Sequence, residues 1–258
     1  MATEISEPAR WSLATRIAFR FFFSYYALRS FIPLLIGRSD FLSERYTDFW
    51  DAAVAWADAA VFHVPYDVFD LAGNDSYSWV QLFCTLVVAG VITAVWSALD
   101  RNRLQYDRIH PWLRLLLRYL LAGAMIEYGA IKIIPSQMTA PPPLGVLLQP
   151  LGDIFPNHLL WWTVGASPVF ETTIGLAELL GGVLLLVPRT TLLGALVSAA
   201  NMLFVFLLNM CYDVPVKLGS LQLLVMAVVL VAPDVPRLAD VFFFHRGTGP
   251  SRVPPLFR

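Results

Sequence analysis

Two glutamates lie inside an apolar stretch that is otherwise typical of a membrane-spanning helix. Glu178 stands within GLAELLGGVLLLV (175–187), and Glu171 precedes it on the same helical face. A carboxylate at bilayer depth is costly unless it is paired, protonated or facing a polar cavity, so such acids are candidates for function by default. Glu178 is therefore a candidate proton carrier. Glu171 has a second explanation, because an acid in the first turn of a helix offsets the helix dipole.

Polar side chains of the next apolar stretch, 192–210, are predicted to lie at the depth of these acids. If the two helices run antiparallel, Asn201 comes level with Glu178, and Asn209 comes level with Glu171. The sequence thus predicts that Glu178, as a neutral acid, donates a hydrogen bond near Asn201. Polar contacts of this kind also simply join helices, and that alternative stays open.

Further polar residues are predicted in the outer half of the same bundle. Tyr128 and Lys132 are one helical turn apart, and Lys132 is expected to pair with Glu171 or Asp213. Snorkelling of Lys132 to the membrane surface is the alternative. The candidate catalytic residues are Glu178, Glu171 and Lys132, and the candidate ligand-binding residues are Tyr128, Asn201, Asn209, Asp213, Lys217 and Glu127.

The composition places these residues in an integral membrane protein. Of 258 residues, 57% are hydrophobic and only 14% are charged, and the mean hydropathy is +0.63. A soluble domain carries nearly twice that share of charge. The net charge of -1 argues against a nucleic-acid partner. Cys84 and Cys211 form no metal or redox motif, and the sequence leaves a disulfide between them open.

The hydropathy pattern predicts an all-α fold with about six transmembrane helices. The expected spans are 11–36, 78–98, 112–134, 168–187, 192–210 and 218–232. Basic residues crowd the connection 99–111, whereas the connection 37–77 carries many more acids than bases. The positive-inside rule therefore predicts that both termini are cytoplasmic.

The first outer connection also contains an apolar pattern with helical spacing. Its members are Tyr46, Phe49, Trp50, Ala53, Val54, Ala57 and Val61. This pattern predicts an amphipathic helix that lies on the outer membrane surface or covers the end of the bundle. The third connection is rich in proline and is not expected to form one continuous helix.

Several stretches resemble the DoxX family of bacterial membrane proteins. They are YGAIKIIPSQM (128–138), PLGD (150–153), LLWWTVGASPVFETTIGLAELLGGVLLLVPRTTLLGAL (159–196) and NMCYDVPVKLGSLQLL (209–224). The resemblance covers about 112–240 and is to a longer subgroup with two extra N-terminal spans. It implies three parts: a two-span extension over 1–111, a four-helix membrane bundle over 112–240 and a cytoplasmic tail over 241–258.

The same resemblance implies a function in the bacterial inner membrane. The chain is similar to the DoxD subunit of thiosulfate:quinone oxidoreductase, which implies a quinone as ligand, no covalent cofactor and redox-enzyme subunits as partners. The main interpretation is a bundle, alone or as a homo-oligomer, that binds a quinone-like or other small lipophilic ligand as a subunit of a membrane oxidoreductase. A structural or assembly subunit and a small-solute or proton-coupled transporter are the alternatives.

Overall fold

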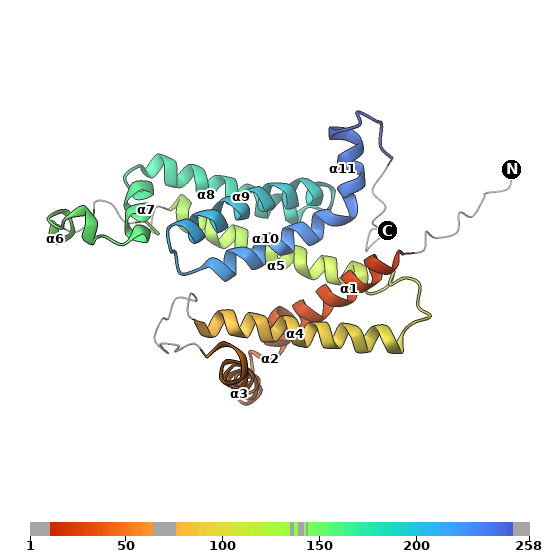
Figure 1. Ribbon diagram of the computed structural model, residues 1–258. Helices are drawn as coiled ribbons and strands as arrows, with labels where there is room; N and C mark the ends of the chain where they lie inside the picture. The colour runs from red at the N-terminus through yellow and green to blue at the C-terminus, as the bar shows by residue number, and fades with distance from the viewer. Residues whose placement is uncertain (1–10, 64–75, 135–136, 139–141, 143, 250–258) are drawn as a thin grey trace. The chain divides into compact units, whose positions relative to one another are not determined.

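The computed structural model describes residues 11–63, 76–134, 137–138, 142 and 144–249, and every regular element among them is a helix (Figure 1). Four helical segments of this part are long and apolar enough to cross a membrane: Ser76–Leu99, Pro168–Leu186, Pro188–Cys211 and Lys217–Phe242. The protein is thus an all-α, multi-pass membrane protein. It divides into two compact units, one ending at His110 and the other continuing from Pro111, which are described separately.

The first unit begins with α1 (Leu13–Tyr26), which continues through a π-helical segment (Ala27–Phe31) into α2 (Ile32–Ile36). The Ser12 hydroxyl caps α1 by accepting a hydrogen bond from the Thr15 amide. This continuous helical stretch matches the expected span 11–36. It is not among the four apolar segments, and Arg16, Arg20 and Arg29 explain why, because they add three charges to it.

The predicted amphipathic helix is present as α3 (Asp40–Ala57) and is followed by a second π-helical segment, Asp58–Phe62. Its buried side chains Trp50, Val54 and Ala57 form one cluster with Val80 and Cys84 of α4 (Ser76–Leu99). The helix therefore uses one apolar face to pack within its own unit.

Two members of the predicted apolar pattern lie outside this buried cluster. The side chains of Phe49 and Val61 are exposed. Phe49 lies beside the buried stripe rather than on it. Val61 belongs to the π-helical segment, in which the wider turn shifts the spacing that the prediction assumed.

A buried arginine of α1, Arg20, contacts α4 and the chain that follows it. The Arg20 guanidinium donates to the Tyr106 hydroxyl (2.8 Å), the Ser97 hydroxyl (2.8 Å) and the backbone carbonyl of Asp100 (2.9 Å). The Tyr106 hydroxyl in turn donates to the Asp100 carboxylate at 2.9 Å. Burial raises the pKa of Tyr106 above its ordinary value, so the hydroxyl keeps its proton at neutral pH. Each of the three guanidinium nitrogens of Arg20, and the Tyr106 hydroxyl, thus donates to a polar or charged acceptor.

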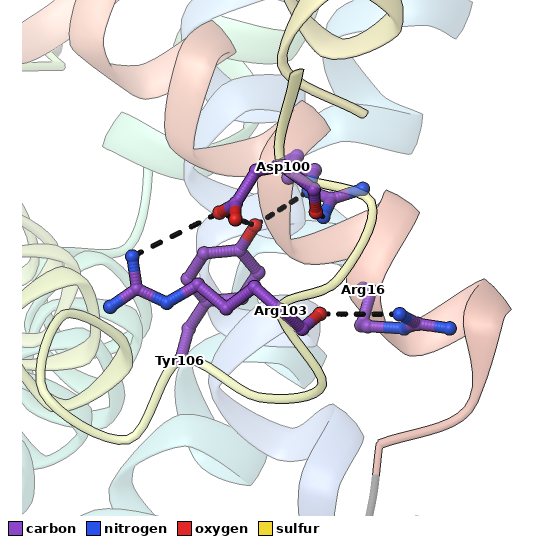
Figure 2. Close-up of polar contacts among 5 residues, drawn as sticks. Arg16, Asp100, Arg103 and Tyr106 are labelled. Atoms are coloured by element: carbon purple, nitrogen blue, oxygen red, sulfur yellow. Dashed lines mark hydrogen bonds and ion pairs between the residues drawn. The ribbon is translucent and has the colours of Figure 1, made fainter. Parts of the chain in front are cut away.

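Two further arginines extend this network in Figure 2. Arg103 forms an ion pair with Asp100 at 3.9 Å, and Arg16 donates to the backbone carbonyl of Arg103 at 3.2 Å. The basic residues that predict the orientation of the chain therefore also fold the connection between α4 and α5.

The second unit contains α5 (His110–Ile133), α6 (Leu144–Leu147), α7 (Pro156–Gly165), α8 (Pro168–Leu186), α9 (Thr191–Cys211), α10 (Lys217–Val231) and α11 (Val235–Phe242). Helices α8, α9 and α10 run side by side, and α9 contacts both of its neighbours (Figure 1). The prediction that the fourth and fifth spans are neighbours is therefore confirmed. Their close packing fixes the positions of the polar residues along them.

Both ends of α8 are set by identifiable contacts. The Ser167 hydroxyl accepts from the Phe170 amide, and Pro168 occupies the first turn. At the other end, the Arg118 guanidinium of α5 donates to the backbone carbonyls of Leu185 and Leu186. These carbonyls have no partner within the helix, so a cation from a neighbouring helix satisfies them.

Candidate functional site

An ion pair between α5 and α8 is the centre of the candidate site. The Lys132 ammonium donates to both Glu178 carboxylate oxygens, at 2.7 and 2.6 Å. Both residues are buried: Glu178 is 0% exposed and Lys132 is 7% exposed. Breaking such a pair leaves an isolated charge in an apolar setting, so each residue holds the other in place.

This pairing corrects the prediction for Lys132. The lysine was expected to pair with Glu171 or Asp213, or to snorkel outwards, because it stands near the end of its helix. The side chain instead extends toward the midpoint of α8, as long lysine stems allow. Glu178 therefore receives a cation as its partner, and the predicted neutral acid donating near Asn201 is replaced by a lysine–carboxylate pair.

Glycines explain why the pair can form. A Cβ atom added to Gly129 would lie 2.7 Å from the Gly175 carbonyl oxygen, and one added to Gly175 would lie 2.8 Å from the Gly129 carbonyl oxygen. The backbones of α5 and α8 therefore touch at this crossing, as small residues permit in membrane helices. The ion pair forms within one helical turn of this crossing, since Lys132 follows Gly129 by three residues and Glu178 follows Gly175 by three.

Glu171 occupies a separate position from this pair. It is 1% exposed, and its carboxylate accepts a hydrogen bond from the Met138 backbone amide at 3.2 Å. The acid therefore holds the chain that follows α5 against the start of α8. This contact, together with its place in the first helical turn, favours a structural role for Glu171 over a catalytic one.

Asn201 contacts α8 in a different way from that predicted. Its side-chain amide donates to the backbone carbonyl of Ala177 at 2.9 Å, rather than meeting the Glu178 carboxylate. Because Ala177 precedes Glu178, the predicted depth is right, but the partner is the helix backbone. Asn201 is thus a link between α8 and α9.

Asn209, Asp213 and Lys217 lie where α9 passes into α10. Lys217 pairs with Asp213, and that aspartate side chain is 78% exposed. Asp213 adopts a left-handed backbone conformation (φ 53°), which helps to turn the chain between the helices. Asn209 is buried, and its amide nitrogen donates to the Ser220 hydroxyl at 3.0 Å.

Tyr128 and Glu127 belong to different faces of α5. The Tyr128 ring lies beside Lys132, with 5.9 Å between the ammonium nitrogen and the ring centroid. Glu127 is exposed, and the structure does not place it with the buried pair. The reason is helical geometry, because five residues separate Glu127 from Lys132 and turn its side chain away from that face.

A cavity of about 140 Å³ lies beside this site. Three of its lining residues are predicted site residues: Tyr128, Lys132 and Asn209. The rest of the wall is mainly apolar and aromatic, and it includes Trp161, Val164, Ile174, Phe204, Val205 and Leu208. An apolar cavity with a few converging polar groups is the usual form of a small-molecule site.

Sequence reasoning missed two polar residues of this wall, Gln137 and Ser220. Ser220 follows Asn209 by eleven residues and meets it only because α9 and α10 are antiparallel neighbours. The pattern of α10 offered a signal, since Ser220 is a polar residue within an apolar run. Gln137 lies just beyond α5, in a region whose local conformation the sequence pattern does not specify.

The described residues contain no group of three or more His, Cys, Asp or Glu side chains that could hold a metal ion. Both cysteines are free, with Cys84 buried and Cys211 exposed. The chemistry available at this site is therefore that of an ion pair, a phenol, amides and hydroxyls around an apolar cavity.

These features define an all-α membrane protein with a buried lysine–glutamate pair beside a small cavity. The chain belongs to the same family as the Bacillus subtilis (strain 168) protein YwoB, with which it shares 33% identity over 125 residues, or 48% of this chain and 79% of the relative. YwoB is described as an uncharacterized protein, so its description names no ligand or activity. No family model matches the chain, and no solved structure does.

Proposed function

We propose that the protein binds a small lipophilic, quinone-like ligand in the cavity of its second unit, as a subunit of a membrane oxidoreductase system. The cavity beside the Lys132–Glu178 pair carries this proposal. Its volume of about 140 Å³ is close to that of engineered apolar cavities that hold a benzene ring. A single ring therefore fits, and two residues of the cavity wall, Phe204 and Val216, are exposed on the surface of the bundle.

The polar part of the wall suits a ring that carries oxygen. Lys132 and Tyr128 supply hydrogen-bond donors, and Glu178 is held against Lys132, where it can exchange a proton with the ammonium. The resemblance to the DoxX family supports an oxidoreductase system and redox-enzyme subunits as partners. Electron transfer itself would be the task of such a partner.

A structural or assembly role is the second candidate. The ion pair and the Gly129–Gly175 crossing both join α5 to α8, and these contacts would serve a protein that only holds others together. A proton-coupled transporter would also use a buried acid. Neither alternative predicts that the purified protein retains a ring-containing lipophile in this cavity.

A cavity-filling variant tests ligand binding. Val205→Trp is expected to abolish retention of a small lipophile by the protein, because the larger side chain enters the space that the ligand needs. Small molecules that co-purify in mild detergent would be identified by mass spectrometry, which also reveals bound partner subunits. Leu207→Trp is the matched control, since Leu207 lies on the exposed side of the same helix.

The two variants give opposite expectations for retention. Leu207→Trp should retain the lipophile at the level of the unmodified protein. Equal retention by both variants, or no lipophile in any sample, would contradict the proposed site.

We further propose six spans in the bacterial inner membrane, with both termini in the cytoplasm. The four apolar helical segments support four of these spans. The continuous helical stretch Leu13–Ile36 and α5 supply two more of sufficient length, since 24 residues of helix extend about 36 Å. One charged residue of each stretch, Arg20 and Lys132, is buried and bonded to polar groups inside the protein.

Cysteine labelling tests this topology. In a background that lacks Cys84 and the exposed Cys211, Ser76→Cys is expected to react with an impermeant maleimide added to intact cells, and Asn102→Cys is not. The expectation follows from the positive-inside rule, because Asn102 lies between Arg101 and Arg103. Permeabilised cells provide the control in which both sites react. Labelling of Asn102→Cys in intact cells would reverse the orientation.

A further inference from the structure

A hydrogen-bond acceptor of a largely buried asparagine, Asn209, belongs to the wall of the cavity. Asn209 is 4% exposed, and its amide nitrogen donates to the Ser220 hydroxyl (3.0 Å) and, at 3.4 Å, to the carbonyl of Val216. Among the described residues, no hydrogen bond reaches the Asn209 side-chain oxygen, Oδ1. Since Asn209 lines the cavity, this oxygen is available to accept a hydrogen bond from a ligand there.

The surrounding bonds decide which end of the amide is free. The Ser220 hydroxyl lies within donating distance of the carbonyls of Lys217 (2.9 Å) and Val216 (3.1 Å), so its proton goes to the backbone. Its oxygen then accepts from Asn209, which requires the amide nitrogen on that side. The Val216 carbonyl can only accept a hydrogen bond, so it also requires the amide nitrogen on that side. The free end of Asn209 is therefore the acceptor.

Donors are available elsewhere on the same wall. An ammonium has three N–H groups, and the two Glu178 oxygens leave one of those of Lys132 free. The Tyr128 hydroxyl has no hydrogen-bond partner among the described residues. The cavity thus presents donors at Lys132 and Tyr128 and an acceptor at Asn209, and the amide of Gln137 on the same wall can donate or accept.

The ion pair also determines the charge that the cavity accepts. Glu178 neutralises Lys132, so a neutral ligand meets no net charge, whereas an anionic ligand would have to compete with the carboxylate for the lysine. The ligand that fits is a neutral ring with one oxygen that accepts a hydrogen bond and one hydroxyl that donates.

Resting on the function proposed above, we infer that the cavity selects the hydroquinone form of its ligand over the quinone form and that Asn209 makes this selection. A hydroquinone offers both an acceptor and a donor. A quinone offers acceptors only, and its carbonyl would face the lone pairs of the Asn209 oxygen. Asn209 is thus a specificity-determining residue.

Two redox-inert probes test this inference without any electron transfer. 4-Methoxyphenol and 1,4-dimethoxybenzene have the same ring and differ in that only the former has a hydroxyl. Calorimetric titration of the full-length protein in detergent is expected to show about tenfold tighter binding of 4-methoxyphenol. Titration into empty micelles corrects for the partitioning of each probe.

Matched variants assign the preference to the free oxygen. Asn209→Leu is expected to remove the tenfold difference between the probes. Ser220→Ala is expected to keep it, because that change removes the bond between the two side chains and leaves the acceptor in place. If Asn209→Leu does not fold, Asn209→Ala, which also removes the acceptor, takes its place in the same comparison.

The outcomes separate this inference from the function on which it rests. Equal binding of the two probes to the unmodified protein would overturn the preference for the hydroquinone form. It would still be consistent with a cavity that binds a ligand. A preference that survives in folded Asn209→Leu would overturn the role of Asn209. If neither probe binds, the preference for the hydroquinone form is overturned. The proposed ligand binding is tested separately, because it predicts that Leu207→Trp retains the lipophile and Val205→Trp does not.

Discussion

Replacing Lys132 with methionine is expected to lower the free energy of unfolding by about 3–5 kcal/mol, because the Glu178 carboxylate is then left buried without its cation. The methionine side chain keeps most of the lysine stem, so the loss reports the charge rather than the packing. The measurement is reversible unfolding in mixed micelles, followed by helix content as the fraction of denaturing detergent rises.

Two further variants complete this experiment. Lys132→Met combined with Glu178→Leu should recover most of the lost stability, because apolar residues that replace both ions leave no buried charge. Lys217→Met removes the same group from a pair whose aspartate is 78% exposed, and it should cost less than about 1 kcal/mol. If Lys132→Met and Lys217→Met cost the same, the buried pair does not stabilise the fold.

Substitution of Gly129 by alanine is expected to cost about 3 kcal/mol, at the upper end for overpacking, and to separate α5 from α8. The added Cβ atom would lie 2.7 Å from both the Gly175 carbonyl oxygen and the Leu179 backbone nitrogen. Backbone atoms of a packed helix cannot move aside as a flexible side chain does. Because Lys132 lies one turn further along α5, the separation also lengthens its contact with Glu178. Thermal unfolding in detergent measures the loss.

Gly123 provides the matched control on the same helix. A Cβ atom added there meets nothing within 4 Å, so Gly123→Ala should be neutral or should stabilise the helix by up to about 1 kcal/mol through its higher helix propensity. If Gly129→Ala is as harmless as Gly123→Ala, the close crossing of α5 and α8 is not required for the fold.

Much of the fold could be predicted because apolar length and end signals act locally. Ser167, Pro168 and Pro188 define α8 nearly to the residue, and the structure ends that helix at Leu186, one residue before the predicted boundary. The stripe of α3 likewise identified Trp50, Val54 and Ala57 as buried. Phe49 shows the limit, since spacing alone does not give the width of an apolar face.

The candidate site could be predicted less well, because it depends on which helices cross and where. The predicted depth in the membrane placed Asn201 correctly beside the middle of α8. Depth does not determine, however, whether an asparagine meets a carboxylate or a backbone carbonyl. The partner of Glu178 depended on the contact between Gly129 and Gly175, which brings α5 within reach. The sequence contains glycines on the Glu178 face of α8, but it does not show which helix they meet.

The separation of Lys132 and Glu178 along the chain has a consequence for biosynthesis. The two residues are 46 positions apart, so in the proposed topology α5 leaves the ribosome well before α8 does. During that interval Lys132 would face the membrane without its counter-ion, at a cost of about 2.5–3.5 kcal/mol for a lysine at the centre of a spanning helix and less nearer its end. We therefore expect the insertion of α5 to become more favourable once α8 has been synthesised and Glu178 can pair with Lys132.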